Sequence, residues 1–227
     1  MSKRVQCPDT RERLVQTAIR LFAQHGVGNV SLRQITRAAG VNTALLHYHF
    51  GSKEDFYEDI IARCINPINE TRRRLLSELQ TRHGDLDVDD VVRAWAEPLL
   101  ANEMTAHQLA MILRLHGDIV GQADPFIRKT TEDYSRETIA LFKAALRRAL
   151  PDLSEHEAAW RFYFLIAVVR NLCVDPPLIE CLTAGRSSIK SLERFRNELI
   201  ENVSRMICAS GSQSRRTDRQ ARLRATG

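Results

Sequence analysis

Four side chains within residues 42–50 could make hydrogen bonds and small apolar contacts in a DNA groove. They lie on one predicted helix and are short or hydrogen-bonding: Thr43, Ala44, His47 and Tyr48. Leu46 is expected to anchor this helix inward, and Leu45 either joins that anchor or touches a thymine methyl group. The stretch therefore predicts a DNA-recognition helix.

Metal and catalytic chemistry have little support in the sequence. His47 and His49 resemble a metal pair, but residues two apart on a helix point to different faces, and no carboxylate or thiol lies nearby at ligand spacing. No phosphate loop, nucleophile elbow, zinc-protease motif or dinucleotide fingerprint occurs. We therefore expect no enzyme, no metal and no cofactor.

The elements that position the recognition helix can be read from their ends. Ser31 and Gln34 form a capping-box pair, so a preceding helix begins at about Leu32. Gly40 supplies the permissive backbone that ends this helix, and Asn42 is a suitable N-cap for the next. Two short helices joined by a turn of about three residues predict a helix-turn-helix.

Together with residues 10–26, this segment resembles the N-terminal domain of TetR-family transcriptional regulators. His47 and Leu45 depart from residues that are common in that family. The matching positions are Leu21, Phe22, Ala23, Gly26, Ser31, Arg33, Ile35, Ala38, Ala39, Gly40, Val41, Tyr48, His49, Phe50, Ser52, Lys53 and Glu54.

The resemblance implies a homodimer whose recognition helices enter successive major grooves of a palindromic operator, about 34 to 36 Å apart. On this reading Arg33, Tyr48 and Lys53 contact phosphates, and Ser31 adds a hydroxyl at a helix N-terminus. Thr43, Ala44 and His47 then face the bases. The recognition segment, with the later Asn-Pro and RRRLL, is also loosely similar to a branch that senses fatty-acyl compounds.

The uneven distribution of charge favours the same interpretation. Residues 1–51 contain seven Lys/Arg and two Asp/Glu, residues 52–209 contain 21 and 25, and residues 210–227 contain five and one. A basic N-terminal region on a slightly acidic body is typical of a phosphate-binding domain joined to a domain with another role. We predict a DNA-binding domain over 1–52, a helical effector-binding and dimerisation domain over 53–209, and a disordered basic tail over 210–227.

The remaining pattern predicts an all-α fold. Ser52 and Asp55 should cap a long helix that Pro67 kinks or breaks, and Pro98 should disturb the helix that starts near residue 87. Further helices are expected from Thr105, Asp124 and Ser154. No run of 18 apolar residues or signal-peptide core is present, so we expect a soluble, cytoplasmic protein.

Two helices have apolar faces suited to a dimer. The helix that follows Ser154 is apolar nearly all round, and residues 188–207 carry one apolar stripe. In TetR-like proteins the last two long helices typically form the dimer interface, although both helices could instead fill a monomeric core. The interface residues we expect are Trp160, Phe164, Ala167, Leu192, Phe195 and Leu199.

Residues 95–142 contain more large apolar groups than one helical face requires, which predicts a hydrophobic small-molecule pocket. The expected lining residues are Trp95, Leu99, Met104, His107, Met111, Leu115, Phe126 and Phe142. We therefore expect a ligand-responsive transcriptional regulator, a repressor released by a hydrophobic effector, for which the loose resemblance above suggests a fatty-acyl compound. The alternatives are a redox-responsive regulator that uses Cys173 or Cys181, and a non-regulatory DNA-binding module.

Overall fold

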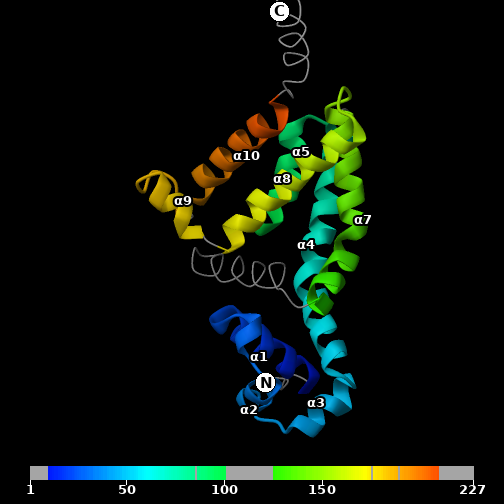
Figure 1. The fold of residues 1–227 in the computed structure, drawn as a ribbon, viewed down its shortest axis with the longest axis vertical. Coiled ribbons are helices and arrows are strands. Elements are labelled where there is room, and N and C mark those ends of the chain that lie inside the picture. The colour runs from blue at the N-terminus through cyan, green and yellow to red at the C-terminus, as the bar shows by residue number, and fades with distance from the viewer. Residues whose placement is uncertain (1–9, 85, 101–124, 175, 189, 210–227) are drawn as a thin grey trace, which may run out of the picture.

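The computed structural model describes residues 10–84, 86–100, 125–174, 176–188 and 190–209, and within these ranges every regular element is a helix (Figure 1). The all-α prediction is confirmed. The elements are α1 Thr10–His25, η1 Val27–Asn29, α2 Leu32–Ala38, α3 Thr43–Phe50, α4 Lys53–His83, α5 Val88–Ala96, η2 Glu97–Leu99, α7 Pro125–Ala149, α8 Glu155–Val174, α9 Pro176–Leu182 and α10 Leu192–Cys208. None of the described helices is long and apolar enough to cross a membrane.

The ends of the N-terminal helices follow the predicted caps. Ser31 with Gln34, and Ser52 with Asp55, form reciprocal capping boxes that begin α2 and α4. The side chain of Asn42 accepts the backbone N–H of the third residue of α3. The predicted helix-turn-helix is thus formed by α2 and α3, and Gly40 in the turn has φ of +67°.

The helices α1, α2, α3 and the first part of α4 bury one apolar cluster, which we call the N-terminal core. Its centre includes Leu14, Phe22, Ile35, Leu46 and Phe56, each no more than 1% exposed. Burial of such side chains contributes about 1.5 to 3 kcal/mol each, which is what holds two short helices against α1.

A second cluster, the C-terminal core, joins α5, α7, α8, α10 and the second part of α4. At its centre the ring of Trp95 meets the rings of Phe142 and Phe162 edge to face, at centroid distances of 5.1 and 4.9 Å. Figure 1 shows α1, α2 and α3 at one end of the molecule and α5 and α10 toward the other, with α4 running between them.

A kink or a break was expected at Pro67, and the break does not occur, because α4 passes through Pro67 as one helix. Apolar side chains on both sides of the proline explain this, because Ile65 packs in the N-terminal core and Ile68 packs against the C-terminal core. Pro98 has the expected effect, because α5 ends at Ala96 and continues as the 3₁₀ turn η2.

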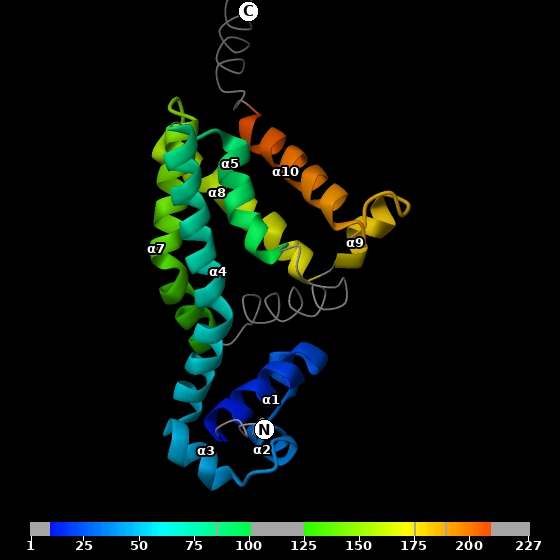
Figure 2. The ribbon, with the colours of Figure 1, turned by 180° about the vertical axis from the view of Figure 1, so that it is seen from behind.

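The C-terminal helices differ in detail from the prediction. The helix expected over residues 188–207 begins only at Leu192, and the short α9 that precedes it was not predicted. In Figures 1 and 2, α9 and α10 lie on the side away from α7. The helix expected from Thr105 and the tail expected after residue 209 lie outside the described residues.

Candidate DNA-binding surface and effector cavity

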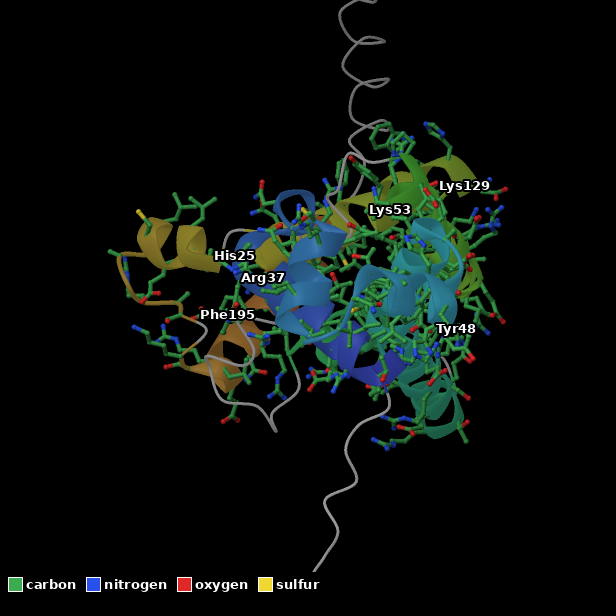
Figure 3. All side chains as sticks on the ribbon, turned by 90° about the horizontal axis from the view of Figure 1, so that it is seen from below. His25, Arg37, Tyr48, Lys53, Lys129 and Phe195 are labelled. Atoms are coloured by element: carbon green, nitrogen blue, oxygen red, sulfur yellow. The ribbon has the colours of Figure 1, made fainter. Side chains whose placement is uncertain are left out.

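The candidate DNA-binding surface is formed by α2, α3 and the start of α4. All seven predicted contact residues are exposed. They are Ser31, Arg33, Thr43, Ala44, His47, Tyr48 and Lys53. Figure 3 looks onto this end of the molecule, with Arg37, Tyr48 and Lys53 labelled. Tyr48 is 83% exposed, which is unusual for a tyrosine without a partner surface.

Packing decides which side of α3 faces outward. Leu46 and Phe50 are buried in the N-terminal core, so the opposite side of the helix faces solvent. Leu45 is 38% exposed, which places it on the outer side rather than in the core. An imidazole nitrogen of His47 lies 3.2 Å from the carbonyl oxygen of Gly51, at the end of the same helix.

The charged side chains that α2 and α3 contribute to this surface are basic. Arg33, Arg37 and Lys53 are exposed, and the sequence between Ser31 and Lys53 contains no Asp or Glu. The ammonium of Lys53 lies 5.3 Å from the centre of the Tyr57 ring. The cations on α2 therefore attract phosphate without a carboxylate on α2 or α3 to compete for them, whereas Glu54 and Asp55 follow Lys53 in the first turn of α4.

Ion pairs join α1 of the N-terminal core to α4. Asp59 accepts hydrogen bonds from Arg11 at 3.0 Å and from Arg63 at 3.1 Å, and Arg63 also bonds Glu12. Hydrogen bonds from Gln16 and from Arg63 lower the pKa of the Glu12 carboxyl. The bundle of three short helices is therefore fixed to α4 by charge as well as by apolar packing.

A cavity of about 250 Å³ lies where both cores meet α4 and α7. Among the described lining residues, seven side chains are apolar and six are polar or charged. The lining residues are Ile65, Ile68, Arg72, Trp95, Leu99, Arg128, Thr131, Glu132, Ser135, Ile139, Ile166, Val169 and Arg170. A largely apolar wall with a few polar groups is typical of a small-molecule site.

The predicted pocket residues fall into three groups. Trp95 and Leu99 line the cavity. Phe142 is fully buried in the C-terminal core, and Phe126 packs against the N-terminal core, so neither is among the lining residues. The other four, Met104, His107, Met111 and Leu115, lie outside the described residues.

Arg72 is a lining residue that the sequence did not reveal. Only 9% of it is exposed, and its guanidinium lies 3.7 Å from the centre of the Trp95 ring. Its Nε donates to the Trp95 carbonyl at 2.9 Å, and a second nitrogen donates to the side-chain oxygen of Asn69. The Asn69 amide in turn donates to the Tyr134 carbonyl at 3.1 Å, so this network joins α4, α5 and α7.

The expected dimer face is only partly on the surface. Trp160 and Phe164 of α8 are 51% and 44% exposed, and Tyr163 between them is 54% exposed. Ala167, Leu192 and Leu199 are half-buried. Phe195 is 3% exposed and packs in this chain's own C-terminal core, although it also lines a groove between α8, α9 and α10, so its part in a dimer interface stays a prediction.

The cysteines differ in reactivity. Burial raises the pKa of the Cys64 thiol to about 12, which keeps it protonated near neutral pH. Cys181 and Cys208 are exposed. Cys173, one of two candidate redox sensors, has no described side chain. In the described part of the chain, no group of three or more His, Cys, Asp or Glu residues is arranged to hold a metal.

Two family models match the chain. Residues 14–60 match the model described as bacterial regulatory proteins of the tetR family, and residues 93–204 match the model described as a tetracyclin repressor-like C-terminal domain. Together they match parts of both cores and leave residues 61–92 between them unmatched.

Individual relatives agree with these models. The chain is 38% identical over 55 residues to the transcriptional regulator AcrR of Shigella flexneri, covering 24% of this chain and 26% of AcrR. It is 28% identical over 145 residues to the regulator BetI of Agrobacterium fabrum, covering 63% of this chain and 66% of BetI. The matches thus span less than two thirds of the length of these relatives.

A solved structure supports the arrangement of the whole fold. The regulator FadR of Bacillus subtilis, in complex with stearoyl-CoA, superposes with a TM-score of 0.58 at 13% identity, covering 85% of this chain and 97% of that chain. At this identity the likeness concerns the fold alone. The two matched domains, the helix-turn-helix and the shared architecture agree. This chain belongs to the TetR family of bacterial transcriptional regulators.

Proposed function

We propose that this protein is a ligand-responsive transcriptional repressor that binds a palindromic DNA operator as a homodimer and is released by a small hydrophobic effector. One observation carries the proposal. The helix α4 begins beside the exposed face of α3 and, further along, contributes Ile65, Ile68 and Arg72 to the apolar cavity. A regulator needs such a physical link between its ligand and its DNA surface.

DNA binding would use two kinds of contact. Arg33, Tyr48 and Lys53 are exposed groups suited to phosphates, and the hydroxyl of Ser31 adds a contact at the N-terminus of α2. Thr43, Ala44 and His47 lie on the outer side of α3, where they would meet base edges. The exposed Leu45 adds an apolar group for a thymine methyl.

Dimerisation would bury the aromatic surface of α8. Trp160, Tyr163 and Phe164 lie one helical turn or less apart and are each about half exposed. Neighbouring exposed aromatic groups of this size mark interaction surfaces in proteins. A groove beside them, between α8, α9 and α10, includes Leu199 and Met206 and continues the apolar surface.

The switch would act through α4. An effector between α4, α5, α7 and α8 has to prefer a conformation in which the two DNA-reading helices of the dimer no longer match successive grooves. The ion pairs of Asp59 with Arg11 and Arg63 would carry a displacement of α4 to α1. An effector with equal affinity for both conformations would shift nothing.

Selection of bound fragments from genomic DNA tests the proposal most directly. The full chain should enrich a sequence with two inverted half-sites about one helical turn apart. Enrichment of unrelated sequences without a palindrome would instead indicate a non-regulatory DNA-binding module. Genes beside the selected site would then identify which effectors to try for release.

A further inference from the structure

The charged side chains of the cavity are strongly biased toward one sign. Three arginines, Arg72, Arg128 and Arg170, line it, and Glu132 is the one carboxylate among the lining residues that the structure describes. The remaining polar groups are the hydroxyls of Thr131 and Ser135. An apolar chamber with this excess of positive charge favours a ligand that carries negative charge on an apolar body.

The arginines occupy different depths. Arg72 is buried and held in place by the Trp95 carbonyl and the Asn69 side chain. Arg128 and Arg170 are exposed, so their guanidinium groups remain in contact with water while the same side chains line the cavity. The exposed pair is therefore at the rim, where an anionic group can be bound without losing all of its hydration.

The present partner of Arg128 is weakly bound. Its Nε lies 3.8 Å from Glu132, one turn further along α7, and the two side chains are 71% and 65% exposed. Ion pairs this exposed contribute about 1 kcal/mol or less. A ligand carboxylate can therefore replace Glu132 beside Arg128 at little cost, whereas a ligand cation would meet three arginines.

The size of the cavity limits the apolar part of the ligand. A volume of about 250 Å³ is just below the usual range for small-molecule sites, about 300 to 1,000 Å³, which favours a compact ligand such as one with an eight-carbon body. The walls that would contact them are apolar side chains of four elements, among them Ile68, Leu99, Ile139 and Ile166.

We propose that the cavity binds a compact amphipathic monoanion, with an apolar body of about eight carbon atoms inside and its carboxylate between the rim arginines Arg128 and Arg170. This inference rests on the proposed function, because it names the chemical class of the effector for the same cavity. Arg72 contributes positive charge from deeper in the wall, and Glu132 opposes binding.

Calorimetric titration of the full-length protein with three eight-carbon probes tests the charge preference. Octanoate should bind at least about tenfold more tightly than octan-1-ol, and octylammonium should bind more weakly than both. A cavity without functional charge would give the opposite order for the first two, since a carboxylate loses more hydration than an alcohol. Octan-1-ol binding as tightly as octanoate, or no binding of any probe, would overturn the proposal.

Variants locate the headgroup. Arg128→Gln and Arg170→Gln should each weaken octanoate about threefold to fivefold and leave octan-1-ol unchanged, and the double variant should abolish the preference. Glu132→Gln should strengthen octanoate. Arg136→Gln is the matched control, because Arg136 lies on α7, is 77% exposed and does not line the cavity. A preference that survives in the double variant would overturn the assignment.

The experiments distinguish failure of the anionic-ligand proposal from failure of the proposed repressor function. A protein that selects a palindromic DNA site but prefers octan-1-ol keeps the proposed function and loses this inference. Circular dichroism of each variant should show unchanged thermal unfolding, because the substituted arginines are exposed.

Discussion

Arg11 of α1 donates a hydrogen bond to Asp59 of α4 over 3.0 Å, and its guanidinium also lies 5.2 Å from the centre of the Phe50 ring at the end of α3. One side chain thus contacts the recognition helix and the helix that reaches the cavity. The carboxylate of Asp59 is 19% exposed and also binds Arg63, so one negative charge forms ion pairs with two arginines.

Asp59→Asn should therefore lower the free energy of unfolding by about 1 kcal/mol or less, because it removes the charge shared by two arginines while keeping the shape of the side chain. Thermal unfolding monitored by circular dichroism measures the change. Asp133→Asn is the control, since Asp133 forms an exposed pair with Arg136 within α7. Equal effects of the two substitutions would show that the link between α1 and α4 adds nothing.

On the DNA-binding surface, residues that contact phosphates should determine affinity and residues that contact bases should determine sequence specificity. Arg33→Ala and Lys53→Ala should weaken binding to all DNA sequences, and each should reduce the dependence of log affinity on log salt concentration by about one for every bound protomer. His47→Ala should instead change the preferred base at one position of each half-site. Fluorescence anisotropy over a range of salt concentrations measures both effects.

Arg147→Ala provides the control for this series, because Arg147 is exposed in the last turn of α7, at the far end of that helix from α3 in Figure 1. Its salt dependence should match that of the unmodified protein. If Arg33→Ala and Lys53→Ala also match it, the proposed docking surface is wrong.

Filling the cavity should uncouple ligand binding from DNA binding. Ile139→Trp places a larger side chain in the lining, so octanoate and octan-1-ol should both fail to bind while affinity for the selected operator is retained. Overpacking should cost about 1 to 3 kcal/mol at most, since the added volume enters existing space. Ile139→Val, which leaves the cavity open, should bind the probes, and equal binding by Ile139→Trp would contradict the site.

The aromatic surface of α8 predicts the position of the dimer interface. Phe164→Glu should raise the dimer dissociation constant at least about tenfold, because it buries a charge against the second chain. Leu141→Glu is a close control, since Leu141 is 43% exposed on α7 compared with 44% for Phe164 on α8. Sedimentation velocity over a range of concentrations distinguishes them. A dimer unaffected by Phe164→Glu would place the interface elsewhere.

The lowered pKa of Glu12 gives a dependence of stability on pH with a defined sign. Hydrogen bonds from Gln16 and Arg63 favour the charged carboxylate in the folded state. Their contribution to stability is therefore complete above the unfolded-state pKa of about 4.3 and is lost as pH falls through the lower folded-state pKa. Glu12→Gln should reduce the slope of stability against pH in this acidic range. Glu70→Gln on an exposed part of α4 should keep the original slope.

The DNA-reading part of the fold could be predicted because its determinants are local. Ser31 and Ser52 begin helices with partners only three residues away, and Asn42 caps α3 in the same way. The burial of Leu46 follows from the same short-range pattern. No distant contact has to be known to place these helix ends.

The cavity depends on contacts between distant segments, so it was predicted less well. Phe126 and Phe142 both lie on α7, but the first packs against the N-terminal core and the second fills the C-terminal core. The order of residues along α7 does not reveal which neighbour each meets. Arg72 sits in a run of three arginines that is typical of a solvated face, and its burial is explained by its stacking on Trp95 and its hydrogen bonds to the Trp95 carbonyl and to Asn69.

Proline has no backbone N–H, so Pro67 leaves the carbonyl of Arg63 without its donor in the helix. This missing hydrogen bond falls between Ile65, a member of one core, and Ile68, which packs against the other. The gap in the hydrogen-bond ladder of α4 therefore lies at the boundary between the two cores. A small change of direction between the two parts of α4 can be taken up at Pro67 without the loss of a backbone hydrogen bond.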